Sequence, residues 1–225
     1  MMPVTKSRKA IIFGTGSFAE VVDFYLQRDS VWQVVAFSVT ADFLREPQFA
    51  GRPVVALEKL AEQYPPGQHD AFVAVGYRGL NGAREEFCCK LRAAGYKLLT
   101  YCNSRATQWG EVTFGDNVFI FEDNTVQPFT AIGDGTILWS GNHVGHHSTV
   151  GPYCFVSSHV VISGHCRIGA NCFLGVNSTI ADGVHIGDRN IIGPATLIQK
   201  STGNDEAYFA ERTARHPKPS SWFMK

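Results

Sequence analysis

An apolar residue recurs at every sixth position through most of the C-terminal half, and this period limits the possible folds more than any other feature. From Phe114 to Ile198, fifteen consecutive positions spaced by six are apolar without exception. Chance does not produce such a run when only roughly half of the residues in an average chain are apolar. A helix would show a period of about 3.6, whereas a fixed period of six suits short strands that each form one side of a triangular coil.

Glycine divides this run into coils. It directly follows the apolar position once every 18 residues, at Gly115, Gly133, Gly151, Gly169 and Gly187. Three sides of six residues make one coil of 18, so five coils are expected from Phe114 to Ile198. A corner that repeats in space favours glycine, which tolerates backbone angles that a Cβ would penalise.

Small side chains recur four residues after the apolar positions and are expected to fill the narrow interior. They include Cys154, Cys166 and Cys172, for which we expect a packing role rather than metal binding or nucleophilic chemistry. All six cysteines are predicted to be reduced thiols, since no pair has C-x-x-C spacing.

The segments 168–178 and 186–188 resemble the hexapeptide-repeat acyltransferases. This resemblance implies a left-handed coil, an exception to the usual right-handed crossover of parallel strands. It also implies a homotrimer with acyl-CoA in the groove between neighbouring prisms.

The N-terminal half reads as a small α/β domain. Residues 9–13 form an apolar strand, Gly14–Ser17 a glycine-rich turn and 18–28 a helix, which together make a place suited to phosphate. Further strands are expected at 34–37, 53–55, 71–75 and 97–101, with helices at 57–63 and 80–94. The expected fold class is therefore a Rossmann-like domain followed by a parallel β-helix. Ser17, Tyr77, Arg78 and Asn81 are candidate ligand contacts at its strand ends.

A dinucleotide such as NAD fits this domain poorly. Ala19 stands where the third glycine of the dinucleotide fingerprint belongs, and Phe37-Ser38-Val39 ends the second strand without an acidic residue.

This domain order resembles the sialic-acid O-acetyltransferase and bacillosamine or perosamine N-acetyltransferase group over nearly the whole chain. The resemblance implies domains at 1–105 and 106–202 and a tail at 203–225, with a nucleotide-linked sugar in the first domain and acetyl-CoA as co-substrate. In the tail, 209–215 replaces the Gly-x-Pro-Ala-Lys segment usual in that group. The implied contacts are Gly14, Thr15, Gly16, Ser17, Phe18 and Arg78 for the substrate, and Phe155, Val176, Gly193 and Ala195 for the cofactor.

Three histidines lie within five residues at 143–147. Acyl transfer from a thioester needs a base, and a histidine pKa of about 6.5 suits that task. By position in the resembled group, His146 is the expected base, assisted by His147 and Asn142. The group usually places acidic residues beside this histidine, but Gly145 and His147 flank it here. Either His147 or a residue from a neighbouring subunit replaces the acidic partner, or the chemistry differs from that of the group.

A metal-dependent hydratase is the main alternative. His165 lies 18 residues after His147, so the two stack on adjacent coils, and γ-class carbonic anhydrases bind zinc on the same kind of prism. Their H-x-x-x-x-H pair is absent, since five residues separate His159 from His165, and no metal is expected. A noncatalytic protein that binds a nucleotide-linked sugar stays open as a third alternative.

Bulk properties exclude some partners. Twenty basic residues balance twenty acidic ones, which argues against nonspecific binding to nucleic acid or anionic membranes. No apolar run reaches the ~20 residues of a membrane span, and the start is too short for a signal core, so a cytoplasmic location is expected. The resemblance to the sugar acyltransferases therefore implies an enzyme that acylates an amino or hydroxyl group of a nucleotide-linked sugar by direct attack on the thioester, at a trimer interface.

Overall fold

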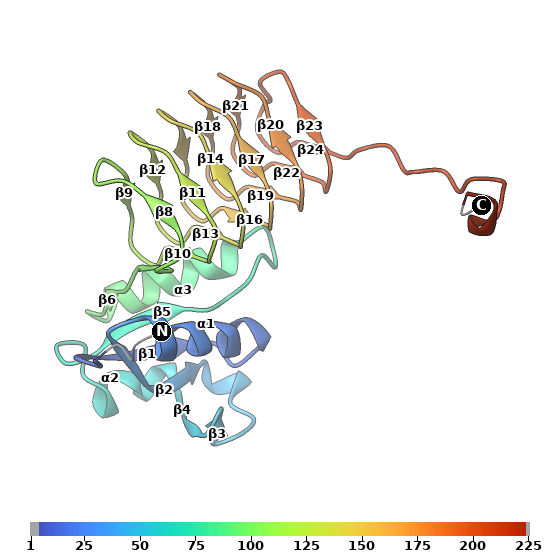
Figure 1. Cartoon of the computed structure of the whole chain (residues 1–225). Coiled ribbons are helices and arrows are strands. Elements are labelled where there is room, and N and C mark those ends of the chain that lie inside the picture. Colours follow the sequence, from blue (N-terminus) through green and yellow to red (C-terminus); the bar gives the residue numbers. More distant parts are fainter. Residues whose placement is uncertain (1–4, 224–225) are drawn as a thin grey trace.

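The computed structural model describes residues 5–223, which form an α/β domain followed by a prism of parallel strands (Figure 1). This confirms the predicted fold class of a Rossmann-like domain and a left-handed β-helix. Residues 1–4 and 224–225, at the outer ends of the predicted first domain and tail, lie outside the described residues. None of the described helices is long and apolar enough to cross a membrane.

The N-terminal sheet has the order β3-β4-β2-β1-β5-β6 and is parallel except for the pair β3–β4. Ile11, Ile12 and Phe13 of the central strand are all buried, as expected for a strand covered on both faces. Every predicted strand and helix is present, although the strand predicted at 97–101 ends at Leu98 and Tyr101 belongs to the prism. The short β3 and the 3-10 turn η1 were not predicted. The elements are β1 Arg8–Phe13, α1 Ser17–Asp29, β2 Trp32–Val39, η1 Ala41–Phe43, β3 Gln48–Phe49, β4 Arg52–Ala56, η2 Leu57–Lys59, α2 Leu60–Gln63, β5 Asp70–Val73, α3 Gly82–Ala93 and β6 Lys97–Leu98.

The prism has three faces, each a parallel sheet of two-residue strands. The first face consists of β7 Tyr101–Cys102, β10 Phe119–Ile120, β13 Ile137–Leu138, β16 Phe155–Val156, β19 Phe173–Leu174, β22 Ile191–Ile192 and β24 Ala207–Tyr208. The second consists of β8 Thr107–Gln108, β11 Thr125–Val126, β14 His143–Val144, β17 Val161–Ile162, β20 Thr179–Ile180 and β23 Leu197–Ile198. The third consists of β9 Thr113–Phe114, β12 Ala131–Ile132, β15 Thr149–Val150, β18 Arg167–Ile168 and β21 His185–Ile186.

The prism is longer than the predicted run of 114–198. Strands β7 and β8 precede it, and Ala207–Tyr208 of the predicted tail pairs with β22. The polar Gln108 interrupts the apolar period at β8, which hid this first coil from the sequence pattern.

The predicted register of the prism is confirmed. The second residue of nearly every strand points into one continuous core, together with the small side chains between the strands. Cys154, Cys166 and Cys172 are buried in this core, and all six cysteines are free, which confirms their packing role.

The periodic glycines owe their position to close packing of coils. None of the five has a positive φ, contrary to the expected conformational reason. A Cβ on Gly133 would lie 2.6 Å from the backbone nitrogen of Pro152, and one on Gly151 would lie 2.7 Å from the backbone of Gly169. These corners therefore have no room for a side chain.

The N-terminal domain packs on the first face. Phe119, Ile137 and Phe155 point outward from the prism and share a core with Val22 and Leu26 of α1. Helix α3 lies beneath the same strands (Figure 1).

Candidate functional site

Three histidines meet at the corner between the second and third faces. The chain turns there after β14, and His147 takes a left-handed backbone conformation with φ 56°. His165, with φ 57°, occupies the same place one coil later, and the two rings stack with centroids 5.1 Å apart. This confirms the predicted column. Phe129 packs against the other side of His147 at 4.8 Å.

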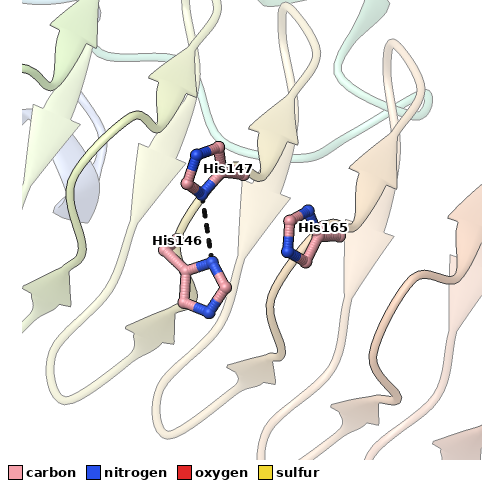
Figure 2. Close-up of side chains that lie close together, drawn as sticks. All are labelled: His146, His147 and His165. Atoms are coloured by element: carbon pink, nitrogen blue, oxygen red, sulfur yellow. Dashed lines mark hydrogen bonds between the residues drawn. The ribbon is translucent and has the colours of Figure 1, made fainter.

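His146 turns its ring toward the other two histidines (Figure 2). Its Nδ1 lies 3.1 Å from Nδ1 of His147, so in a neutral pair one nitrogen donates a proton and the other accepts it. All three side chains are exposed. The backbone N–H of His146 donates to Oε1 of Gln127 at 2.9 Å.

Asp182 lies near His146 although it is two coils further along the chain. Gly164 occupies the same corner on the coil between them and leaves an open space. A Cβ on Gly164 would lie 3.0 Å from Oδ1 of Asp182 and 3.0 Å from Cε1 of His146. The sequence reasoning missed this carboxylate because it considered only the residues beside the histidine; counting by 18 would have found it.

Asn142 has a structural role instead of the expected catalytic one. Only 2% of the residue is exposed. Its Nδ2 donates to the carbonyl of Trp139, and its Oδ1 accepts from the backbone N–H of Val160 on the next coil. Because both ends of this amide serve the prism, the side chain has no free group for a reaction at the corner.

A cavity of 390 Å³ opens between the N-terminus of α1 and the first face of the prism. Its lining includes Gly16, Ser17 and Phe18 of the predicted substrate contacts. Gly14 shapes the turn that precedes them, with φ 122° and room for no Cβ, which would lie 2.9 Å from the carbonyl oxygen of Ala74. The rest of the lining comes from Val21, Ala74, Gly76, Tyr77, Trp139 and Phe155.

Thr15 lies on the other side of the glycine-rich turn, in a smaller cavity of 160 Å³. The segment that follows β2 forms part of the wall of this cavity and contributes charged and aromatic side chains. Its other lining residues are Phe43, Arg45, Glu46, Gln48, Phe49 and Val54.

A groove of 510 Å³ continues from Ser17 along α1 to Glu122. Oε2 and Oε1 of Glu122 accept hydrogen bonds from the hydroxyls of Tyr25 at 2.7 Å and Ser140 at 2.8 Å. Partial burial opposes ionisation of this carboxyl, but the two hydrogen bonds outweigh it and lower the pKa of Glu122. The same burial and the bond to Glu122 raise the pKa of Tyr25 to about 12.

Two other candidates lie outside the main cavity. Arg78 is exposed and is not part of the cavity lining, although Tyr77 beside it is. Asn81 is fully buried, where its amide bonds to the carbonyl of Cys172 and to the guanidinium of Arg84. Asn81 is therefore a structural residue and cannot contact a ligand.

Three of the four expected cofactor contacts, Val176, Gly193 and Ala195, lie at one corner of the prism, whereas Phe155 does not. Val176 and Ala195 adjoin at the corner between the first and second faces, where the N–H of Ala195 donates to the carbonyl of Val176 at 2.9 Å. Gly193 packs under the ring of Phe209. Phe155 does not fit the expected cofactor contact. It is only 5% exposed and lies in the wall of the cavity beside α1.

The histidine corner and the main cavity lie on different sides of one prism. The cavity opens on the first face, whereas His146 lies at the edge between the two other faces. Within one chain, the histidine corner is therefore not part of the cavity lining.

The repeat matches a known sequence family. Residues 129–164 and 165–200 match the family described as bacterial transferase hexapeptide (six repeats). Comparison of the sequence with curated proteins gives no match.

Solved structures resemble both domains together. A histidine-to-asparagine variant of perosamine N-acetyltransferase from Caulobacter crescentus, in complex with CoA and GDP-perosamine, is 26% identical, with a TM-score of 0.79 over 88% of this chain and 92% of that one. The acetyltransferase domain of PglB from Neisseria gonorrhoeae is 23% identical, with a TM-score of 0.74 over 87% and 93%. WeeI from Acinetobacter baumannii is 17% identical, with a TM-score of 0.74 over 89% and 96%. The last two support the fold alone.

These similarities confirm the resemblance to the hexapeptide-repeat sugar acyltransferase group. They favour this class over the hydratase and the noncatalytic binding protein that the sequence left open.

Proposed function

We infer that this chain is an acetyl-CoA-dependent sugar acetyltransferase of the hexapeptide-repeat group and that it acetylates an amino group of a nucleotide-linked sugar. The observation that carries the inference is the 26% identical enzyme of the same two-domain order, which was solved with CoA and a nucleotide-linked amino sugar. Acetyl-CoA is the expected co-substrate, because the similar perosamine N-acetyltransferase structure contains CoA.

The glycine-rich turn supports binding of the nucleotide-linked sugar. The first backbone N–H groups of α1 have no helical partner, and the positive end of the helix dipole favours phosphate. The cavity beyond Ser17 offers aromatic walls at Tyr77 and Trp139 for the sugar, and the smaller cavity beyond Thr15 has space for the nucleoside. The diphosphate would then cross the turn at Gly14–Ser17.

His146 acts as the general base of the transfer. The amine nitrogen attacks the thioester carbonyl, and the N–C bond forms while the C–S bond breaks. His146 accepts the proton that the nitrogen loses and then gives it to the departing thiolate, which forms CoA-SH and restores the neutral imidazole. The contact of its Nδ1 with Nδ1 of His147 orients the ring, and the carboxylate of Asp182 lies across Gly164 from it.

The site is completed between copies of the chain. Because the cavity and the base lie on different sides of one prism, a ligand held by one protomer meets the histidine of a neighbour. A closed homotrimer provides this contact three times by the same rotation. The corner at Val176 and Ala195 then borders the groove that holds the pantetheine of acetyl-CoA.

A thiol-release assay with acetyl-CoA and a panel of nucleotide-linked amino sugars tests this function. Substitution of His146 by Ala is expected to lower turnover by roughly 10²–10⁴-fold, because the base is lost. The oligomer should stay intact in size-exclusion chromatography. His185→Ala is the matched control, since this histidine is exposed on the third face, away from the cluster.

Turnover of the His146→Ala variant at the wild-type rate would exclude His146 as the base. If no amino sugar in the panel is acetylated but a hydroxylated analogue is, the reaction is O-acetylation and the amine acceptor is wrong.

A further inference from the structure

The two Nδ1 atoms of His146 and His147 lie at a separation that suits two ligands of one metal ion. Tetrahedral zinc bonds imidazole nitrogen at about 2.0–2.1 Å, which places two such nitrogens about 3.3 Å apart. The observed distance is 3.1 Å. A shared cation satisfies both lone pairs at once, whereas two neutral imidazoles must use a proton of one ring to do so.

His165 supplies a third imidazole at the same place. One ring nitrogen from each histidine lies within 4.8 Å of the other two. All three side chains are exposed, and the described hydrogen bonds to their rings join only His146 to His147. Side-chain rotation can therefore bring His165 onto the ion without breaking a hydrogen bond.

The surroundings support a cation at this corner. Phe129 and His165 flank the His147 ring on its two sides and limit its motion. The carboxylate of Asp182 lies on the other side of the His146 ring, across the space left by Gly164, and contributes a negative charge. The three ligands project into solvent, so water can fill the fourth position.

We propose that His146, His147 and His165 form a binding site for a divalent transition-metal ion, best suited to zinc, and that bound zinc inhibits the enzyme. Three imidazoles with an open fourth position are a typical zinc ligand set. The inhibition rests on the proposed function of His146. A neutral imidazole that coordinates zinc through one nitrogen carries its proton on the other, so it has no lone pair left to accept the proton of the substrate.

Binding is tested without any substrate. The oligomeric protein is freed of metal with a chelator, and zinc chloride is titrated in competition with a chromophoric zinc indicator. One zinc ion per chain is expected to bind. His165→Asn should weaken the affinity at least tenfold, while asparagine preserves the left-handed backbone at this position. His185→Asn, which changes a histidine outside the cluster, should bind zinc as the wild type does.

The inhibition is tested in the thiol-release assay. Zinc should suppress wild-type turnover at the concentrations at which it binds, and a chelator should restore it. His165→Asn should keep its metal-free turnover and resist the same zinc concentrations.

Two results would overturn the site: no binding at tens of micromolar zinc, or an equal loss of affinity in His165→Asn and His185→Asn. Binding of zinc to the three histidines with full turnover would instead overturn the inhibition and the role of His146 as base, while the metal site would stand.

Discussion

At the scale of single residues, the surroundings of His146 depend on Gly164, which has no side chain. His146, Gly164 and Asp182 follow one another at intervals of one coil, and the glycine between them leaves the histidine ring and the carboxylate facing the same space. Under the proposed function, Asp182 of the same chain takes the place of the flanking acidic residue that the sequence lacks at Gly145 and His147.

Replacement of Asp182 by Asn tests this partner. The change keeps the shape of the side chain and removes the negative charge that lies across Gly164 from the His146 ring. We expect kcat to fall at least tenfold, since orienting carboxylates of catalytic histidines contribute this much or more. The KM for acetyl-CoA should stay nearly constant, and Asp182→Glu should recover part of kcat.

The control for this prediction is Asp42→Asn, which removes a carboxylate from η1 in the other domain. In Asp182→Asn, a rise in the KM for acetyl-CoA with an unchanged kcat would assign Asp182 to ligand binding instead of orientation of the base.

At the scale of elements, one buried arginine joins α3 to the prism. The guanidinium of Arg84 donates to the carbonyls of Gly135, Tyr153 and Cys154 in the prism. It also donates to the carbonyls of Val75 and Gly76, which lead into the cavity wall. No carboxylate pairs with it in the described structure, and burial lowers the pKa of Arg84 to about 10. Carbonyl groups alone therefore compensate the buried charge.

Substitution of Arg84 by Met should destabilise the whole chain. Methionine fills much of the same volume but removes the donor of five carbonyl oxygens, and those that stay buried without a partner, such as those of Gly135 and Tyr153, each cost about 1–3 kcal/mol. We expect the free energy of unfolding in urea to fall by about 3 kcal/mol or more. Arg78→Met, at the exposed neighbouring arginine, should change it little. Equal stability of the Arg84 and Arg78 variants would contradict the role given to this network.

The contact between α1 and the first face should depend on pH. Tyr25 and Ser140 lower the pKa of Glu122 in the folded state, so the unfolded chain binds more protons near that pKa. The contribution of Glu122 to stability is complete above its unfolded pKa of about 4.3 and is lost as the pH falls through the lower folded value.

Thermal unfolding followed from pH 6 to pH 3 measures this effect. Glu122→Gln should flatten the decline in melting temperature at the acidic end, whereas Glu62→Gln, at an exposed carboxylate of α2, should decline as the wild type does. Parallel curves for Glu122→Gln and wild type would show that these hydrogen bonds do not stabilise the ionised carboxyl.

At the scale of the whole molecule, the proposed function requires a working unit of more than one chain, because the cavity and His146 lie on different sides of one prism. His146→Ala removes the base, and Ser17→Trp fills the cavity at the start of α1, so each variant alone should be inactive. Random mixing of the two chains in one oligomer gives about a quarter of sites an intact base and an intact cavity from different protomers.

Co-expression of the two variants should therefore restore about a quarter of wild-type turnover. Co-expression of His146→Ala with itself under a second tag is the control for expression level. A mixed oligomer that forms but stays inactive would place base and cavity of each site in the same chain.

The sequence by itself determined the prism and the order of the domains. The period of six can be recognised from short segments, because each two-residue strand buries its second residue in the prism core. The residue before each buried position carries a second pattern. The outward positions of the first face are apolar or aromatic at Tyr101, Phe119, Ile137, Phe155, Phe173 and Ile191, which indicates a covered face.

Only the tertiary structure decided what each of these side chains meets. Phe155 faces the N-terminal domain, Asn142 bonds within the coil, and Asp182 approaches His146 across Gly164. These contacts depend on which face the first domain covers and on packing between coils that are distant in the sequence. A residue-by-residue comparison with a family motif cannot predict the covered face or the packing between coils, because both arise only when the chain folds.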